Sequence, residues 1–178
     1  MVKEENAIIL DFLSYGYPLE KKMMPLAQAI GTKGFTLLEL VPRRGVKFEV
    51  GENVYIGDDK REKVQYILGR CPRENLTETA KIQLGEFVKK FVEENEERYV
   101  KFFNEAQAIN TRLHQFELLP GLGKKHTLAI LKTREEKLFD SFEDINGRIA
   151  NLPSPQNLIE RRIMRELTEM ERHNLFVI

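Results

Sequence analysis

The sequence predicts an α+β protein, with a small N-terminal β-barrel domain over residues 1–74 and a helical domain over residues 75–178. Three observations support this prediction. Short apolar segments separated by turn residues fill the first 70 positions, and this pattern is typical of a small barrel. From Thr77 onwards, apolar residues recur at steps of three and four, which is the period of an amphipathic helix. The chain of 178 residues is 42% hydrophobic and contains one cysteine, so it can bury a core but cannot form an intrachain disulfide.

Turn residues divide the N-terminal region into candidate strands. Gly16 and Pro18 end the first strand, and residues 19–34 are expected to form a long connection. In the turn of residues 42–45, Pro42 pre-sets φ and Gly45 can adopt a positive φ. The strands are expected at residues 7–13, 35–41, 46–50, 53–56 and 64–68. Because closing a sheet removes its exposed edges, five short strands with tight turns favour a barrel.

The helical domain is predicted as one long amphipathic helix followed by shorter ones. The long helix begins near Thr77 and either continues to Ala106 or breaks near Asn95. The apolar C-terminal tail, Leu175 to Ile178, is expected to pack or to add a strand. The shorter helices are expected at residues 111–118 and 124–133, from Phe142 after the N-cap Ser141, and from Pro155 as the first helical residue.

Composition excludes some functional classes. Lysine plus arginine and aspartate plus glutamate number 28 each, so bulk electrostatics predicts no affinity for polyanions. No apolar run approaches the roughly 20 residues that span a bilayer, and the acidic N-terminus does not resemble a signal peptide. We therefore expect a cytoplasmic protein without membrane contact, in which any polyanion site depends on local placement of basic residues. The segment from Leu118 to Arg134 is such a place, because it has four basic residues and no acidic one.

The strongest local signal lies within this segment. Leu119-Pro120-Gly121-Leu122-Gly123, followed by an apolar helix, resembles the helix-hairpin-helix motif. Its two glycines allow a tight reversal, and Leu122 between them is expected to plug into the core. The motif usually has a small residue where Thr127 stands.

Such a hairpin can bind an anion. The backbone N–H groups that begin the second helix lack partners and, with the helix dipole, attract phosphate. Lys124 and Lys125 lie in this first helical turn, and His126 could add a contact. The helix dipole itself disfavours lysines there, so their presence indicates a phosphate partner. The candidate binding residues are Gly121, Leu122, Gly123, Lys124, Lys125 and His126. The alternative is a purely structural interhelical turn.

A second candidate site is the basic turn formed by Arg43, Arg44 and Lys47. A basic hairpin tip on a small barrel can touch phosphates, and the alternative is an ordinary solvated turn. Three aromatic residues of the barrel could serve as stacking platforms for bases, although such residues more often belong to the core. They are Phe48, Tyr55 and Tyr66.

Several segments together resemble an uncharacterised archaeal family, recorded as a domain of unknown function and predicted to bind nucleic acid. These are Ala7–Asp11, Pro25–Gly31, Phe35–Pro42, Glu52–Gly57, Arg112–His126 and Ser141–Ile145. The resemblance implies an OB-like barrel followed by a helical region with a helix-hairpin-helix at about residues 111–133. It implies no known activity, and the family's predicted role slightly favours RNA over DNA.

These observations favour a non-catalytic nucleic-acid-binding protein. The hairpin would bind the phosphate backbone and the barrel would supply a second contact surface. The alternative is a protein-interaction module in a ribosome- or polymerase-associated complex. Asp140 and Asp144 follow the hairpin at the spacing of a glycosylase aspartate, but their surroundings do not match that pattern. The sequence contains no P-loop, nucleophile–base pair or metal-ligand cluster, so we expect no enzymatic activity, no cofactor and no metal.

Overall fold

The computed structural model describes residues 2–21 and 23–178. Contacts divide the chain into two compact units. The first comprises Met1–Phe87 and Glu166–Ile178, and the second comprises Val88–Arg165. The sequence boundary at residues 74–75 follows the change from strands to helices. The contacts group the first part of the long helix and the C-terminal segment with the strands.

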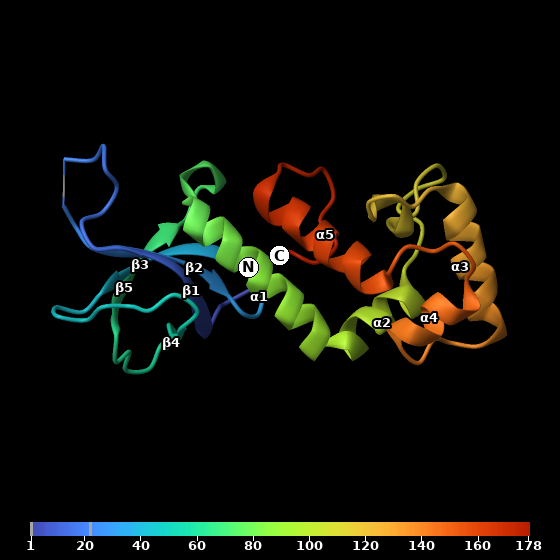
Figure 1. The fold of residues 1–178 in the computed structure, drawn as a ribbon, viewed down its shortest axis with the longest axis horizontal. Coiled ribbons are helices and arrows are strands. Elements are labelled where there is room, and N and C mark those ends of the chain that lie inside the picture. The colour runs from blue at the N-terminus through green and yellow to red at the C-terminus, as the bar shows by residue number, and fades with distance from the viewer. Residues whose placement is uncertain (1, 22) are drawn as a thin grey trace. The chain divides into compact units, whose positions relative to one another are not determined.

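The described residues form an α+β fold with five strands, five α-helices and two 3-10 helices (Figure 1). The strands are β1 (Asn6–Leu13), β2 (Leu26–Gly31), β3 (Leu37–Pro42), β4 (Asn53–Tyr55) and β5 (Val64–Arg70). The helices are η1 (Arg73–Asn75), α1 (Glu78–Glu94), α2 (Glu96–Glu105), η2 (Gln115–Leu118), α3 (Lys124–Glu136), α4 (Phe142–Arg148) and α5 (Pro155–Thr168).

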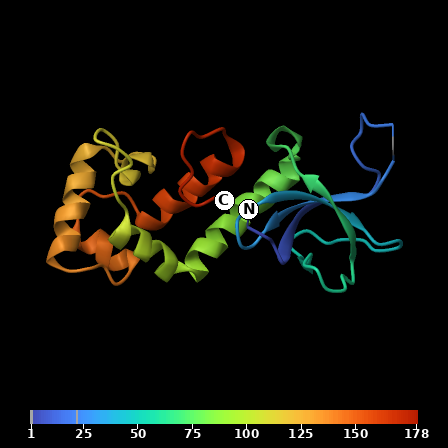
Figure 2. The same ribbon diagram turned by 180° about the vertical axis from the view of Figure 1, so that it is seen from behind.

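All strands belong to one curled antiparallel half-barrel (Figure 1; Figure 2). Their order is β4-β1-β2-β3-β5, so β4 and β5 are the two edge strands. Every strand pair is antiparallel. The pairing of β1 with β2 and that of β3 with β5 contain register shifts, and such bulges increase the local twist and bend of a sheet.

Two strand predictions are wrong. Residues 26–31, predicted as part of a connection, form β2, which is buried along its whole length between β1 and β3. Such a central strand needs no alternation of apolar and polar residues. Residues 46–50, predicted as a strand, are irregular. Phe48 nevertheless packs edge to face against Phe12, with ring centroids 5.7 Å apart. The alternation of apolar and polar residues in this segment therefore reflects side-chain burial and not strand pairing.

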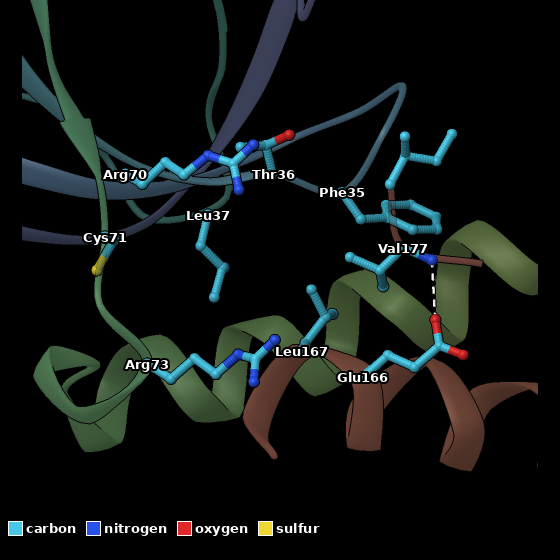
Figure 3. A pocket seen from close by; sticks show the side chains of 10 residues that line it. Phe35, Thr36, Leu37, Arg70, Cys71, Arg73, Glu166, Leu167 and Val177 are labelled. Atoms are coloured by element: carbon cyan, nitrogen blue, oxygen red, sulfur yellow. Dashed lines mark hydrogen bonds between the residues drawn. The ribbon is translucent and has the colours of Figure 1, made fainter. Parts of the chain in front are cut away.

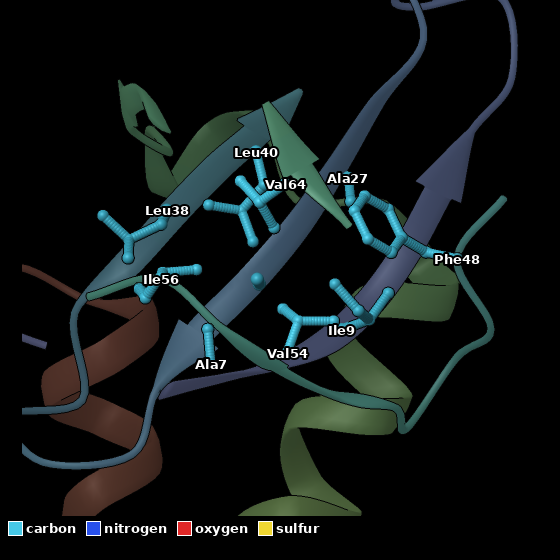
Figure 4. Packing of buried hydrophobic residues seen from close by; sticks show 10 residues of the cluster. Ala7, Ile9, Ala27, Leu38, Leu40, Phe48, Val54, Ile56 and Val64 are labelled. Carbon is cyan, nitrogen blue, oxygen red and sulfur yellow. The ribbon is translucent and has the colours of Figure 1, made fainter. Parts of the chain in front are cut away.

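The core of the first unit lies inside the half-barrel (Figure 4). Side chains from all five strands and from two loops converge there. The members include Ala7, Ile9, Ala27, Leu38, Leu40, Phe48, Val54, Ile56 and Val64. Because successive side chains of a strand point to opposite faces, Gln28 and Glu39 project to the outer face of the sheet.

Polar contacts on this outer face fix the start of α1. The buried Gln28 donates to the carbonyl of Asn75 at 2.6 Å and accepts from the N–H of Thr77 at 3.1 Å. The Thr77 hydroxyl donates to Asp11 on β1 and accepts from the N–H of Ala80. Thr77 therefore caps the helix while it ties the helix to the sheet.

The remaining helices follow the sequence predictions with one exception. The long helix breaks at Asn95, α4 begins after Ser141, and α5 begins at Pro155. The Ser141 side chain accepts from the N–H of Asp144 at 2.9 Å, which confirms the predicted cap. The helix predicted over residues 111–118 is wrong in length, because only the four residues of η2 are helical.

The C-terminal tail packs as expected and forms no strand in the described residues. Glu166, which is fully buried, accepts hydrogen bonds from the N–H groups of Leu175, Phe176 and Val177. The N–H of Ile178 donates to the carbonyl of Gly34 at 3.1 Å. A buried carboxylate that receives three backbone N–H groups fixes the path of the tail.

Candidate functional site

The hairpin of the second unit begins with the short helix η2. The Nδ1 atom of His114 accepts from the N–H of Phe116 at 3.1 Å, and the carboxylate of Glu117 accepts from the N–H of His114 at 2.8 Å. This reciprocal capping box satisfies the first donors of a very short helix. The His114 ring also stacks on the buried Phe116 ring at 4.8 Å.

The turn after η2 reverses the chain within five residues. Leu122 is buried, which confirms the predicted plug, and its N–H donates to the carbonyl of Leu119 at 3.1 Å. Gly121 has a φ of 90°. Glycine adopts this conformation readily, whereas a residue with a Cβ atom would be strained there. Gly123 is extended at φ −119° and ψ −163° and is the N-cap of α3. The glycines and the buried leucine therefore place the start of α3 at the surface.

The first turn of α3 presents donors and positive charge. No acidic residue lies in it. Within the described residues, the backbone N–H groups of Gly123, Lys124, Lys125 and His126 have no hydrogen-bond acceptor, as expected at a helix N-terminus. The two lysines are exposed. Together with the positive end of the helix dipole, this surface favours an anion.

The two lysines have different surroundings. Lys124 Nζ lies 3.2 Å from a carboxylate oxygen of Glu117 and donates to the carbonyl of Arg112 at 2.9 Å. Lys124 therefore links α3 to η2. Lys125 has neither an ion pair nor a hydrogen bond to any residue that the structure describes. Lys125 is thus the lysine whose charge is available to a ligand.

The next two residues complete the hairpin. The Nε2 atom of His126 lies 3.3 Å from the carbonyl oxygen of Asn151, so His126 contacts the loop before α5. Thr127 is buried, and its hydroxyl donates to the carbonyl of Gly123 at 2.9 Å. This bond satisfies the buried hydroxyl of Thr127 within the first turn of α3.

Two ionisable groups of the hairpin have pKa values below their usual ones. Burial, together with the nearby Arg134, lowers the pKa of His114 below its usual value, so the ring is neutral and can accept through Nδ1. The backbone N–H of His114 and then the Lys124 ammonium lower the pKa of Glu117. Both shifts favour the charge states that the capping box uses at neutral pH.

The basic turn after β3 belongs to the first unit. Arg43 donates through Nε to the carbonyl of Arg61 at 2.7 Å, and its N–H donates to the carbonyl of Lys63. Arg44 and Lys47 are exposed and have no charged or hydrogen-bonded partner among the described residues. Arg43 is thus held in place, whereas Arg44 and Lys47 are available for contact.

The three aromatic candidates differ in exposure. Phe48 is buried in the half-barrel core. It is therefore a core residue and not a stacking platform for bases. Tyr55 is half-buried, and its hydroxyl accepts from the N–H of Asp59 at 3.2 Å. Tyr66 on the edge strand β5 is 40% exposed. Of the three, Tyr66 offers the most open ring surface.

Sequence reasoning missed a polar cluster on the outer face of the sheet. The Tyr17 hydroxyl donates to Glu39 Oε1 at 2.6 Å and accepts from Gln28 Nε2 at 3.1 Å. Burial and the bond to Glu39 raise the pKa of Tyr17 strongly. A cavity of about 360 Å³ adjoins Tyr17 and Glu39. The only available signal was Gln28 and Glu39 themselves, two polar residues within otherwise apolar segments.

A smaller cavity of about 110 Å³ lies between the start of β3, the end of β5 and the C-terminal tail (Figure 3). Arg70 and Arg73 approach it from β5 and η1, and Arg73 donates to the carbonyl of Glu169. Cys71 also lines it. Burial, reinforced by the charge of Glu39, raises the pKa of the Cys71 thiol to about 11, so this thiol is inert at neutral pH.

Three further features bear on the class of protein. Among residues 2–21 and 23–178, no group of three or more His, Cys, Asp or Glu side chains is placed to hold a metal ion. In the same residues, each helix is too short or too polar to cross a membrane. Asp144, one of the two aspartates after the hairpin, accepts from the N–H of Asp140 and from Arg148 within α4.

The structure is that of an α+β protein with a curled five-stranded half-barrel and a helical unit in which a glycine-containing turn precedes α3. The chain belongs to the DUF655 family of proteins of unknown function, whose model matches residues 3–178. It is 42% identical over 176 residues to the uncharacterized protein MJ0038 of Methanocaldococcus jannaschii, covering 98% of this chain and 80% of that protein. The crystal structure of Af1531 from Archaeoglobus fulgidus, also of this family, is 40% identical with a TM-score of 0.85, covering 98% of this chain and all of that one.

Proposed function

We propose that this protein binds nucleic acid without catalysis, through phosphate contacts at a helix-hairpin-helix. The observation that carries the proposal is the first turn of α3. Among the residues that the structure describes, it combines backbone N–H groups without acceptors, no acidic residue and Lys125, a lysine without a partner. Main-chain donors and lysines bind the sugar-phosphate backbone without reading bases. In this proposal η2 and α3 are the two helices of the motif, with η2 reduced to a single turn.

The balanced charge of the chain limits the affinity. Each phosphate that the protein neutralises adds a salt-dependent increment to the binding free energy. The hairpin offers few such contacts. We therefore infer that the half-barrel supplies a second contact surface, with Arg44 and Lys47 as its exposed cations. Family resemblance favours RNA slightly over DNA as the partner.

We also propose that the half-barrel is OB-like. Its five short strands and the order β4-β1-β2-β3-β5 support this comparison, because an OB fold is a partly open five-stranded barrel. One feature departs from that fold. β3 and β5 pair antiparallel here, whereas an OB fold pairs its third and fifth strands in parallel.

Fluorescence anisotropy with labelled single- and double-stranded RNA and DNA tests the proposal. For each phosphate that the protein neutralises, a tenfold increase in salt concentration should lower the logarithm of the association constant by about 0.9 on a duplex and by about 0.7 on a single strand. Lys125→Ala should flatten the salt dependence by one such unit. Lys89→Ala is the matched control, because Lys89 is an exposed lysine on α1 in the same unit. Equal loss in both variants, or no loss in either, contradicts the hairpin contact.

One observation favours a protein-interaction module as a second candidate. The connection between β1 and β2 exposes large apolar side chains, with Tyr15 at 76%, Leu19 at 99% and Met23 at 78%. Exposed apolar clusters often mark interaction sites. The same anisotropy series separates the two candidates. If no nucleic acid binds at low salt, the interaction module becomes the better account.

A further inference from the structure

The cavity beside Tyr17 and Glu39 in the first unit has the construction of a ligand site. Its volume of about 360 Å³ falls within the range of small-molecule pockets, about 300–1,000 Å³. Its walls combine apolar and polar residues. The apolar ones are Met24, Leu26, Leu68 and Pro72, and the polar ones are Tyr17, Glu20, Glu39, Arg70 and Asn75. Strands β2, β3 and β5 provide part of the lining, so the pocket is built on a rigid sheet as well as on loops.

Glu39 is the chemical centre of this pocket. The residue is 8% exposed, and its Oε1 atom accepts the short bond from Tyr17. No described residue donates to Oε2. Oε2 is nevertheless not fully enclosed by protein atoms. Since Glu39 lines the cavity, this oxygen is the acceptor that the cavity presents to a ligand.

The bond network holds this acceptor in one orientation. Gln28 donates to the hydroxyl of Tyr17, and Gln28 is in turn fixed by the backbone of Asn75 and Thr77. The Tyr17 hydroxyl therefore uses its hydrogen on Glu39 and has no donor left for a ligand. The free oxygen of a carboxylate accepts hydrogen bonds, so the pocket selects a ligand that presents N–H donors to it.

We propose that this pocket takes a single unstacked nucleobase from a single strand, with guanine as the preferred base. Guanine presents two adjacent donors, its ring N1–H and its exocyclic amine. Adenine and cytosine place an acceptor beside the amine, and uracil places carbonyls on both sides of its N–H. An acceptor next to the donor would face the carboxylate and repel it. Single-stranded regions are where proteins read Watson–Crick edges in this way.

Arg70 extends the same site toward the backbone. It lines both this cavity and the smaller one of Figure 3, it is exposed, and its side chain has no hydrogen-bonded or ionic partner among the described residues. An arginine at the rim can bind the phosphate of the nucleotide whose base is inserted. The proposal rests on the nucleic-acid-binding function inferred above and adds to it a strand type and a preferred base.

The test uses the full-length chain and two labelled RNAs, an oligouridine strand and the same strand carrying one guanine. Wild type should bind the guanine-containing strand at least about fivefold more tightly, as expected for a specific base contact. Glu39→Gln retains an acceptor for Tyr17 but turns a donor toward the cavity, so the guanine preference should disappear. Glu49→Gln removes the same charge from an exposed position of the same unit and should keep the preference.

A second measurement separates this inference from the proposed function. Guanosine monophosphate, compared with uridine monophosphate, should shift the backbone amide signals of Tyr17, Leu68 and Arg70 in NMR spectra. If neither nucleotide shifts them and both strands bind equally, the pocket proposal is overturned while binding through Lys125 can still hold. If guanosine monophosphate shifts them but no strand responds to Lys125→Ala, the pocket stands and the hairpin function fails. Thermal melting of Glu39→Gln verifies that its fold is intact.

Discussion

Gly123→Ala separates phosphate binding by the hairpin from its structural role. Gly123 has ordinary extended dihedral angles, and an added Cβ would meet no heavy atom within 4 Å. Glycine is a better N-cap than alanine by a few tenths to about 1 kcal/mol. Alanine gains about 0.4–1 kcal/mol by restricting the unfolded chain. These terms nearly cancel, so the free energy of unfolding should change by less than about 0.5 kcal/mol.

The effect on binding should be much larger. The added methyl group occupies the open space beside the N–H row, where a phosphate would approach. A hydrogen bond to a charged group contributes about 1.5–3 kcal/mol, so its loss weakens binding about 10- to 100-fold. Urea unfolding measures the stability and fluorescence anisotropy measures the affinity. A variant that folds like wild type and binds like wild type would refute the role of these backbone donors.

Gly121→Ala provides the contrast. Gly121 also has open space around it, but its φ of 90° is strained for alanine. Such strain costs about 1–3 kcal/mol, so this variant should lose stability as well as affinity. The pair therefore distinguishes a blocked phosphate from a distorted turn.

Three further predictions concern stability and reactivity. Glu4→Ala should lower the free energy of unfolding by about 3 kcal/mol or more in urea titrations, because this buried carboxylate accepts three backbone N–H groups of the β2–β3 connection; an unchanged midpoint would contradict this. Cys71 should resist iodoacetamide at pH 7 until urea unfolds the chain, since a thiol pKa of about 11 leaves only about one thiolate in 10⁴; rapid labelling of the folded protein would show the thiol to be accessible. The pKa of His114 is lower in the folded chain than in the unfolded one, so its contribution to stability is complete above about pH 6.5 and declines as the pH falls below that value; His114→Asn should remove this part of the pH dependence, and an identical profile would exclude His114 as its source.

The sequence predicted those parts of the fold that depend on local chemistry. The start of α4 after Ser141 and the start of α5 at Pro155 were predicted from side chains at the helix ends. The break at Asn95 was one of two alternatives that the sequence left open. β2 was missed because small residues, Pro25 and Gly31 resemble a loop, whereas its burial depends on β1 and β3, which are distant in sequence. Tertiary contacts decided the outcome there.

The candidate sites likewise include parts that are contiguous in sequence and parts that meet only in the folded chain. The turn before α3 was predictable because its proline, glycines and lysines are contiguous in sequence. The pocket at Glu39 was not, because Tyr17 and Glu39 are 22 residues apart and meet only through sheet pairing. The different roles of Lys124 and Lys125 also required the structure, since the contact of Lys124 with Glu117 depends on the reversal of the chain.

Backbone NMR of the full-length chain tests the central claim most directly. Single- and double-stranded RNA and DNA would each be titrated into isotope-labelled protein while the amide signals are followed. Phosphate binding at the hairpin predicts that the amides of Gly121 and of residues 123–126 shift first and furthest, and that added salt reverses the shifts. If a nucleic acid binds and these amides stay in place, the start of α3 is not the phosphate site and the account is contradicted.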